Sequence, residues 1–163
     1  MEEVPEIVIY TDGSALGNPG PGGYGILMLY KSQKKEIKQG YRLTTNNRME
    51  LLAIIVSLEM LKVSGREVII YSDSKYVIDS VTKGWVFGWL KKGFKGKKNA
   101  DLWRRFLKIY PKNKVKFQGV KGHANIPGNE HVDKLAVFAA NDKTNHLVDE
   151  GYEASQDDAG MFT

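Results

Sequence analysis

The sequence contains no cysteine. Disulfide bonds and zinc–thiolate centres are therefore excluded, and any metal site must be built from oxygen and nitrogen ligands. A chain without thiols suits the reducing cytosol, so we expect a cytoplasmic protein.

Long hydrophobic runs are also lacking. The longest apolar stretch, Leu51 to Val56, is far too short to span a bilayer, and the opening MEEVPEIVIY lacks the basic and apolar segments of a secretion signal. We therefore expect no membrane association and no secretion. No heptad pattern or exposed apolar stripe is present, so we expect a monomer.

The sequence has fewer acidic than basic residues, and charges of both signs are unevenly distributed along it. The net charge is +5, and the stretch from Lys83 to Lys98 has six lysines and no acid, whereas Asp149 to Asp158 has five acids and no base. Trp85 and Trp89 lie within the basic stretch. Such a stretch is typical of either a nucleic-acid surface or an amphipathic helix packed by its tryptophans, with lysines in solvent. The composition leaves both interpretations open.

The order of apolar patterns predicts one α/β domain over residues 1–141. Continuous apolar runs at Ile7–Tyr10 and Val68–Ser72 are typical of strands buried on both faces. Three meander strands, a helix, a strand, helices, a strand and a final helix predict a five-stranded mixed sheet of order 3-2-1-4-5, flanked by helices. Beyond residue 141 the pattern fades, so we expect residues 142–163 to form a partly disordered tail.

Four carboxylates are predicted to meet at one edge of this sheet. Asp12 and Asp73 each follow a buried strand, and these two strands are neighbours in the predicted order. The first turn of the next helix brings Glu50, and the last helix brings Asp133. Each of these four carboxylates also has a possible structural role, as a turn residue, a helix cap or a surface acid. For Glu50, the spacing from Asn47 also fits a capping box.

A cluster of four carboxylates needs a partner. Two unit charges about 5 Å apart repel each other by roughly 3 kcal/mol at an effective dielectric constant of about 20. A set of oxygen ligands favours Mg²⁺, with Mn²⁺ as a substitute. Two such ions would clamp a scissile phosphate between an attacking water and a leaving oxygen.

Five motifs in order give the chain a family resemblance. TDGSALGNPGPGGYG, TTNNRMELLA, YSDSKYV, the Trp–Lys stretch with NADLW, and VKGHANIPGNEHVDKLA resemble a type 1 ribonuclease H of bacterial form, from about Glu6 to Asn141. The resemblance implies the ribonuclease H-like fold. It also implies a metal-dependent endonuclease that cuts the RNA strand of RNA–DNA hybrids, leaving 3′-hydroxyl and 5′-phosphate ends.

The resemblance also implies roles for individual residues. Asp12, Glu50, Asp73 and Asp133 would hold two Mg²⁺ ions, and His123 would assist proton transfer and product release. The residues implied to contact the hybrid near the cut are Asn18, Asn46 and Asn47. Those implied to grip a DNA-strand phosphate are Thr45 and Asn99, and those implied to line the DNA strand are Trp85, Trp89, Lys91 and Lys92.

Two other functions stay open. A DNA-cutting relative, such as a resolvase or transposase core, would share the carboxylates, although TTNNRME and LGNPGPGG match the hybrid-reading segments. A nucleic-acid-binding module with an inactive site is the second alternative, and the presence of all four carboxylates and His123 argues against it.

Overall fold

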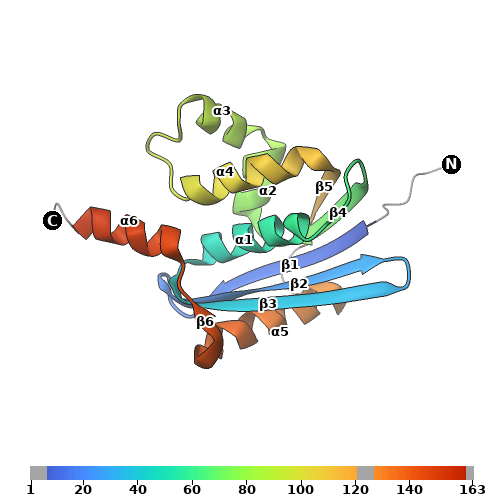
Figure 1. The fold of residues 1–163 in the computed structure, drawn as a ribbon, viewed down its shortest axis with the longest axis horizontal. Helices are drawn as coiled ribbons and strands as arrows, with labels where there is room; N and C mark the ends of the chain where they lie inside the picture. The colour runs from blue at the N-terminus through green and yellow to red at the C-terminus, as the bar shows by residue number, and fades with distance from the viewer. Residues whose placement is uncertain (1–6, 121–126, 161–163) are drawn as a thin grey trace.

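The structure, a computed structural model, describes residues 7–120 and 127–160 and places one mixed sheet at the centre of the fold (Figure 1). The strands are β1 (Ile7–Ala15), β2 (Gly20–Tyr30), β3 (Gln33–Thr44), β4 (Glu67–Ser72), β5 (Lys114–Gly119) and β6 (His146–Leu147). The helices are α1 (Asn46–Glu59), α2 (Lys75–Thr82), α3 (Trp85–Lys91), α4 (Ala100–Ile109), α5 (Pro127–Asn141) and α6 (Glu150–Gly160), with short 3-10 turns η1 (Tyr110–Lys112) and η2 (Lys143–Asn145).

The strand order is β5-β4-β1-β2-β3-β6. The predicted order of the five main strands is confirmed, and the predicted fold class with it. The prediction of five strands is wrong in one respect, because the two-residue strand β6 adds a sixth at the edge, parallel to β3. Such a short pairing carries no hydrophobic pattern that could be detected in the sequence.

The two faces of the sheet are covered by different helices. The α1 helix packs on one face of β1 and β2, with α4 beyond it, and α5 packs against β1, β2 and β3 on the other face (Figure 1). This double cover explains why β1 is continuously apolar: Ile7 and Ile9 are buried, and Val8 and Tyr10 on the alternate face are half-buried. None of the described helices combines the length and apolar character needed to cross a membrane.

The glycines after Asp12 have a packing role. In the structure Gly23 and Gly25, both in β2, let this strand approach α5 closely. A Cβ atom at Gly23 would lie 2.7 Å from the backbone nitrogen of Ala140, and one at Gly25 would lie 2.5 Å from the carbonyl oxygen of Val132. The absence of these side chains lets α5 approach the sheet closely, and α5 carries Asp133.

The C-terminal segment has more structure than its sequence pattern predicts. Residues 143–147 form η2 and β6, and residues 150–160 form α6, which extends beyond the end of the sheet in Figure 1. Its side chains reach the main body: Arg42 of β3 makes two hydrogen bonds to Glu153, at 2.9 and 2.8 Å. Long-range pairs of this kind hold a helix whose own sequence is weakly amphipathic.

Candidate active site and nucleic-acid interface

The parallel pairing of β1 with β4 brings Asp12 and Asp73 together. Tyr10 is paired with Tyr71 in the register, so Asp12 and Asp73 each lie two residues further along neighbouring strands. Together with Glu50 they form a group whose carboxylate oxygens lie within 4.8 Å of one another. The predicted convergence of these three residues is present in the structure.

The position of Glu50 depends on the glycine that follows Asp12. A Cβ atom at Gly13 would lie 2.3 Å from the backbone nitrogen of Glu50 and 2.5 Å from the carbonyl carbon of Met49. Only glycine therefore allows the first turns of α1 to lie directly over the end of β1. The predicted capping box is wrong: Thr45 is the N-cap of α1, and its hydroxyl accepts from the backbone nitrogen of Arg48 at 3.3 Å.

Asp133 reaches the same place from α5. Its carboxyl lies near Asp12 and Asp73, and its proximity raises the pKa values of both. It does not belong to the group whose oxygens lie within 4.8 Å of one another. The fourth predicted carboxylate thus lies beside Asp12 and Asp73 and comes from α5, on the face of the sheet opposite α1.

Electrostatics make this cluster unfavourable without cations. Burial, the charge of Asp73 and the contact with Asp133 raise the pKa of Asp12 to about 9, against the lowering effect of the hydrogen bond from the Gly13 nitrogen. Loss of surrounding water also raises the pKa values of Glu50 and Asp73. Several oxygen donors, close together and difficult to ionise, fit a hard divalent cation, which would restore their charged forms.

The residues expected to contact the hybrid are connected to this cluster. The Asn18 side chain accepts from the backbone nitrogen of Asn46 at 3.2 Å, and Asn46 Nδ2 donates to Glu50 Oε1 at 2.8 Å. Asn47, the next residue of α1, is exposed. The loop after β1 and the start of α1 thus present asparagine side chains at the edge of the carboxylate cluster.

The expected phosphate-binding pair is also brought together. Thr45 and Asn99 are far apart in the sequence, and Arg48 contacts both: its backbone nitrogen donates to Thr45 and its Nη1 donates to Asn99 Oδ1 at 3.4 Å. Asn99 has the left-handed backbone angle φ of 65° just before α4, a conformation that asparagine tolerates.

Both interpretations of the Trp–Lys stretch describe part of the structure. Trp89 packs edge-on against Trp103, with ring centroids 6.0 Å apart, as expected for an anchored helix. Trp85 is 47% exposed, and the Nζ atoms of Lys83 and Lys97 lie 5.2 and 5.1 Å from the ring centroids of Trp85 and Trp89. The surface therefore combines accessible aromatic faces with cations. We call residues 85–98 the basic protrusion.

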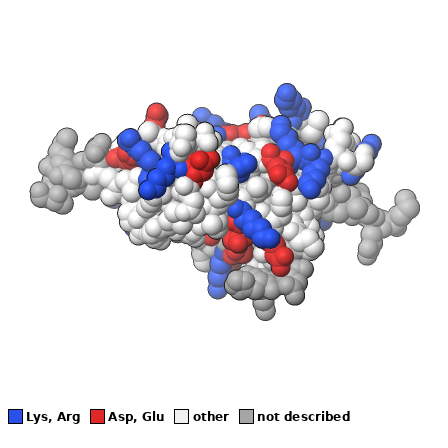
Figure 2. Space-filling model, turned by 90° about the horizontal axis from the view of Figure 1, so that it is seen from below, with Lys and Arg blue, Asp and Glu red and all other residues white. Residues whose placement is uncertain are grey.

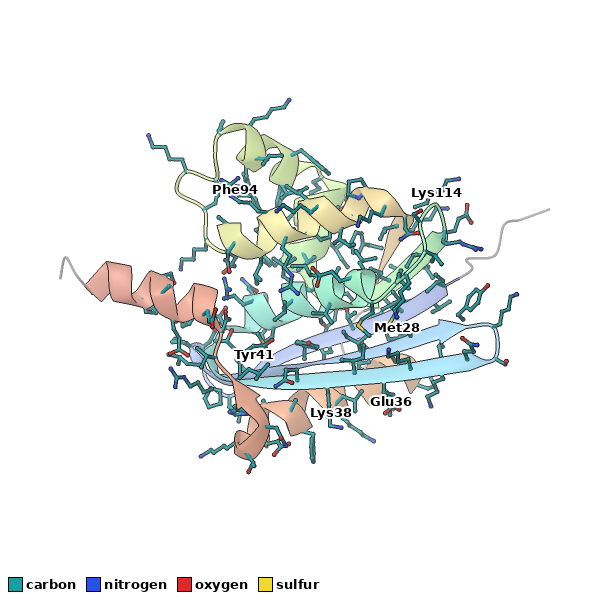
Figure 3. The ribbon with its side chains drawn as sticks, viewed as in Figure 1. Met28, Glu36, Lys38, Tyr41, Phe94 and Lys114 are labelled. Carbon is teal, nitrogen blue, oxygen red and sulfur yellow. The ribbon has the colours of Figure 1, made fainter. Side chains whose placement is uncertain are left out.

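A buried phenylalanine anchors the basic protrusion to α4. Phe94 is 4% exposed and lies between α3 and α4 (Figure 3), with the Cζ atom of Arg104 4.8 Å from the centre of its ring. Lys91 and Lys92 at the end of α3 are exposed.

On the α5 side of the molecule, by contrast, the described basic and acidic side chains are interspersed (Figure 2).

His123 lies outside the described residues.

Two residues next to Thr45 and Asn99 were not identified from the sequence. They are Arg48, which is 3% exposed, and its partner Asp149, which is 7% exposed. For Arg48 the only signal was its place in TTNNRMELLA, two residues before Glu50, and a pattern search would assign such an arginine to the helix surface.

Comparison with known proteins agrees with this geometry. A ribonuclease H family model matches residues 4–141. The ribonuclease H of Desulforamulus reducens is 54% identical over 140 residues, which cover 83% of this chain and 87% of that protein.

Two solved structures share the fold. A type 1 ribonuclease H with the type 2 active-site motif has a TM-score of 0.76 at 32% identity, covering 94% of this chain and 82% of that one. Another ribonuclease H, solved in complex with an RNA/DNA hybrid, has a TM-score of 0.62 at 26% identity, covering 85% of this chain and 99% of that one. With the motifs in order, the sheet topology and the carboxylate cluster all in agreement, this chain belongs to the ribonuclease H family, in its type 1 bacterial form.

Proposed function

We propose that this protein hydrolyses the RNA strand of RNA–DNA hybrids endonucleolytically, leaving 3′-hydroxyl and 5′-phosphate ends. The observation that supports this most directly is the cluster of Asp12, Glu50 and Asp73, with Asp133 beside it, in a chain of the ribonuclease H family. The related protein solved with an RNA/DNA hybrid supports the choice of substrate.

Asp12, Glu50, Asp73 and Asp133 are the residues that would hold two Mg²⁺ ions, or Mn²⁺ in their place. When bound, the two ions would supply positive charge at the scissile phosphate and make an attacking water more acidic. The chain itself keeps the carboxylates close together. The Gly13 nitrogen donates to Asp12 Oδ1 at 2.9 Å, and Asn46 together with Ser74 orients Glu50.

Recognition of the hybrid would divide between its two strands. Asn18, Asn46 and Asn47 border the carboxylates, where amide groups would bond the ribose 2′-hydroxyls that distinguish RNA from DNA. Thr45 and Asn99 would bind a phosphate of the DNA strand. The residues that would contact that strand further along are Trp85, Trp89, Lys91 and Lys92.

The remaining assignments rest on the family resemblance and on composition. We propose that His123 assists proton transfer and product release, since an imidazole titrates near neutral pH. We also propose that residues 1–141 form the catalytic domain, with 142–163 as an appended segment, and that the protein works as a monomer in the cytoplasm.

The test is cleavage of a labelled duplex set comprising RNA–DNA, RNA–RNA and DNA–DNA, each with Mg²⁺ or a chelator. We expect metal-dependent cutting of only the RNA in the hybrid, and loss of cutting in Asp73→Asn. Cutting of the DNA duplex would favour a DNA-cutting relative, and binding of the hybrid without cutting would indicate an inactive binding module.

A further inference from the structure

The acidic C-terminal segment has a contact that its sequence does not explain. Asp149 lies between β6 and α6 and is 7% exposed. Its carboxylate accepts from Nε and Nη2 of Arg48 at 2.8 and 2.9 Å and from the hydroxyl of Thr44 at 2.7 Å. A surface tail thus contributes a buried carboxylate to the start of α1.

Arg48 connects this carboxylate to the expected phosphate site. Its guanidinium has five N–H donors, and the contacts that it makes use the whole group. Nε and Nη2 bond Asp149, Nη1 and Nη2 bond Asp101 at 2.8 and 2.7 Å, and Nη1 also bonds Asn99 at 3.4 Å. Because two carboxylates already neutralise its charge, Arg48 orients its neighbours rather than binding a phosphate itself.

Asn99 is fixed between Arg48 and a second contact. Its Oδ1 accepts from Arg48, and its Nδ2 donates to the hydroxyl of Tyr76 at 3.1 Å. That hydroxyl also accepts from Trp103 Nε1 at 2.8 Å. The orientation of the Asn99 amide is therefore set by a chain of bonds that begins at Asp149.

We infer that Asp149 is a positioning residue for the DNA-phosphate site formed by Thr45 and Asn99. It fixes the Arg48 guanidinium, and Arg48 in turn fixes Asn99 and the first turn of α1, where Thr45 is the N-cap. The inference rests on the proposed function of Thr45 and Asn99. It extends the substrate-binding machinery into residues beyond the matched family region, which ends at residue 141.

The consequence of losing the Asp149 charge follows from this geometry. In Asp149→Asn the guanidinium retains Asp101, whose side chain is 48% exposed, and loses a charged partner on the buried side. The Arg48 guanidinium is then free to shift, and Asn99 loses the fixed position of the group that donates to its Oδ1. Contacts to a phosphate remote from the cut stabilise the bound substrate and the transition state alike, so their weakening raises KM rather than lowering kcat.

The experiment compares hybrid cleavage by the full-length wild type and Asp149→Asn, at a temperature where both are folded by circular dichroism. We expect KM for the hybrid to rise about tenfold and kcat to stay within about twofold. Glu153→Gln breaks the exposed pair with Arg42 in the same segment and is the matched control for a charge change. Ile54→Val, at a buried position of α1, is the control for lost stability. Neither should change KM.

A double-mutant comparison separates positioning from stability. Asn99→Ala should raise KM in the wild type and add little in the Asp149→Asn background, because the same contact has already been lost. Fully additive effects, or an unchanged KM in Asp149→Asn despite a lower Tm, would show that Asp149 is only structural and overturn the inference alone. An unchanged KM in both Asn99→Ala and Thr45→Ala would overturn the proposed phosphate site and the inference together.

Discussion

Replacing Asp12 by asparagine should abolish cleavage and at the same time stabilise the metal-free protein. The substitution keeps the size of the side chain and an oxygen that accepts from the Gly13 nitrogen, while it removes the group that ionises next to Glu50 and Asp73. The expected gain in stability therefore arises from electrostatics alone.

The magnitude follows from the distance between the carboxylates. Two unit charges 4.8 Å apart, the limit within which these oxygens lie, repel by about 3.5 kcal/mol at an effective dielectric constant of about 20. Near pH 8 the folded wild type avoids this repulsion by keeping a proton on Asp12 that the unfolded chain releases, and keeping that proton also costs free energy. Allowing about half of the repulsion for relaxation and solvent, the variant should gain about 2 kcal/mol. For a chain of this size that corresponds to a rise in Tm of roughly 5 °C.

The pH dependence gives the prediction a second readout. The folded pKa of Asp12 is about 9, and an unfolded aspartate titrates near pH 3.9. Between these values the folded state holds a proton that the unfolded state has released, so the free energy of unfolding of the wild type falls as pH rises through this window. The variant lacks this proton and should show a flatter curve.

The assay is thermal unfolding in a chelator at several pH values from 5 to 9, with and without added Mg²⁺. Mg²⁺ should stabilise the wild type more than the variant, since ligand binding to the folded state raises stability. Glu150→Gln, an exposed acid of α6, is the control for a change in net charge. A metal-free variant less stable than the wild type at pH 8, or parallel pH curves, would refute the reasoning.

Three further predictions concern the surroundings of the cluster. Gly13→Ala should lower kcat about 100-fold, because the new Cβ atom displaces the start of α1. The control is Gly119→Ala, whose Cβ atom would meet only a side-chain atom at 3.8 Å and which should leave cleavage unchanged. Equal activities of the two variants would contradict the packing argument. Trp85→Ala should weaken hybrid binding, measured by fluorescence anisotropy in a chelator, by about 1 kcal/mol while changing Tm little, since the ring is 47% exposed. Replacing Lys91 and Lys92 by alanine should reduce the slope of log binding constant against log salt by about 2, and an unchanged slope would show that neither lysine contacts a phosphate.

Much of this architecture was predictable because it is encoded locally. Apolar runs that end in Asp12 and Asp73 mark strands buried on both faces, and the rule of right-handed crossovers places those strands side by side. The strand register then brings the two carboxylates level. The helix pattern after Asn47 indicates α1, although the cap at Thr45 was misassigned because Thr, Asn and a later Glu all fit N-terminal signals.

Other features have no local signal. The glycines of β2 indicate a close approach, but only the packed fold shows that the approaching element is α5, through Gly23 and Gly25. Strand β6 has only two residues and is too short to produce a hydrophobic pattern. The sequence therefore did not predict the sixth strand or the regular structure of the C-terminal segment.

The sequence by itself determined the family, the sheet order and the convergence of the carboxylates, because motifs and periodicity depend on residues near one another in the chain. The tertiary structure alone decided which distant groups neutralise each other. Arg48 and Asp149 are 101 positions apart, and nothing near either residue indicates the other. A buried guanidinium requires a charged partner, but only folding the whole chain shows that the C-terminal segment provides one of them.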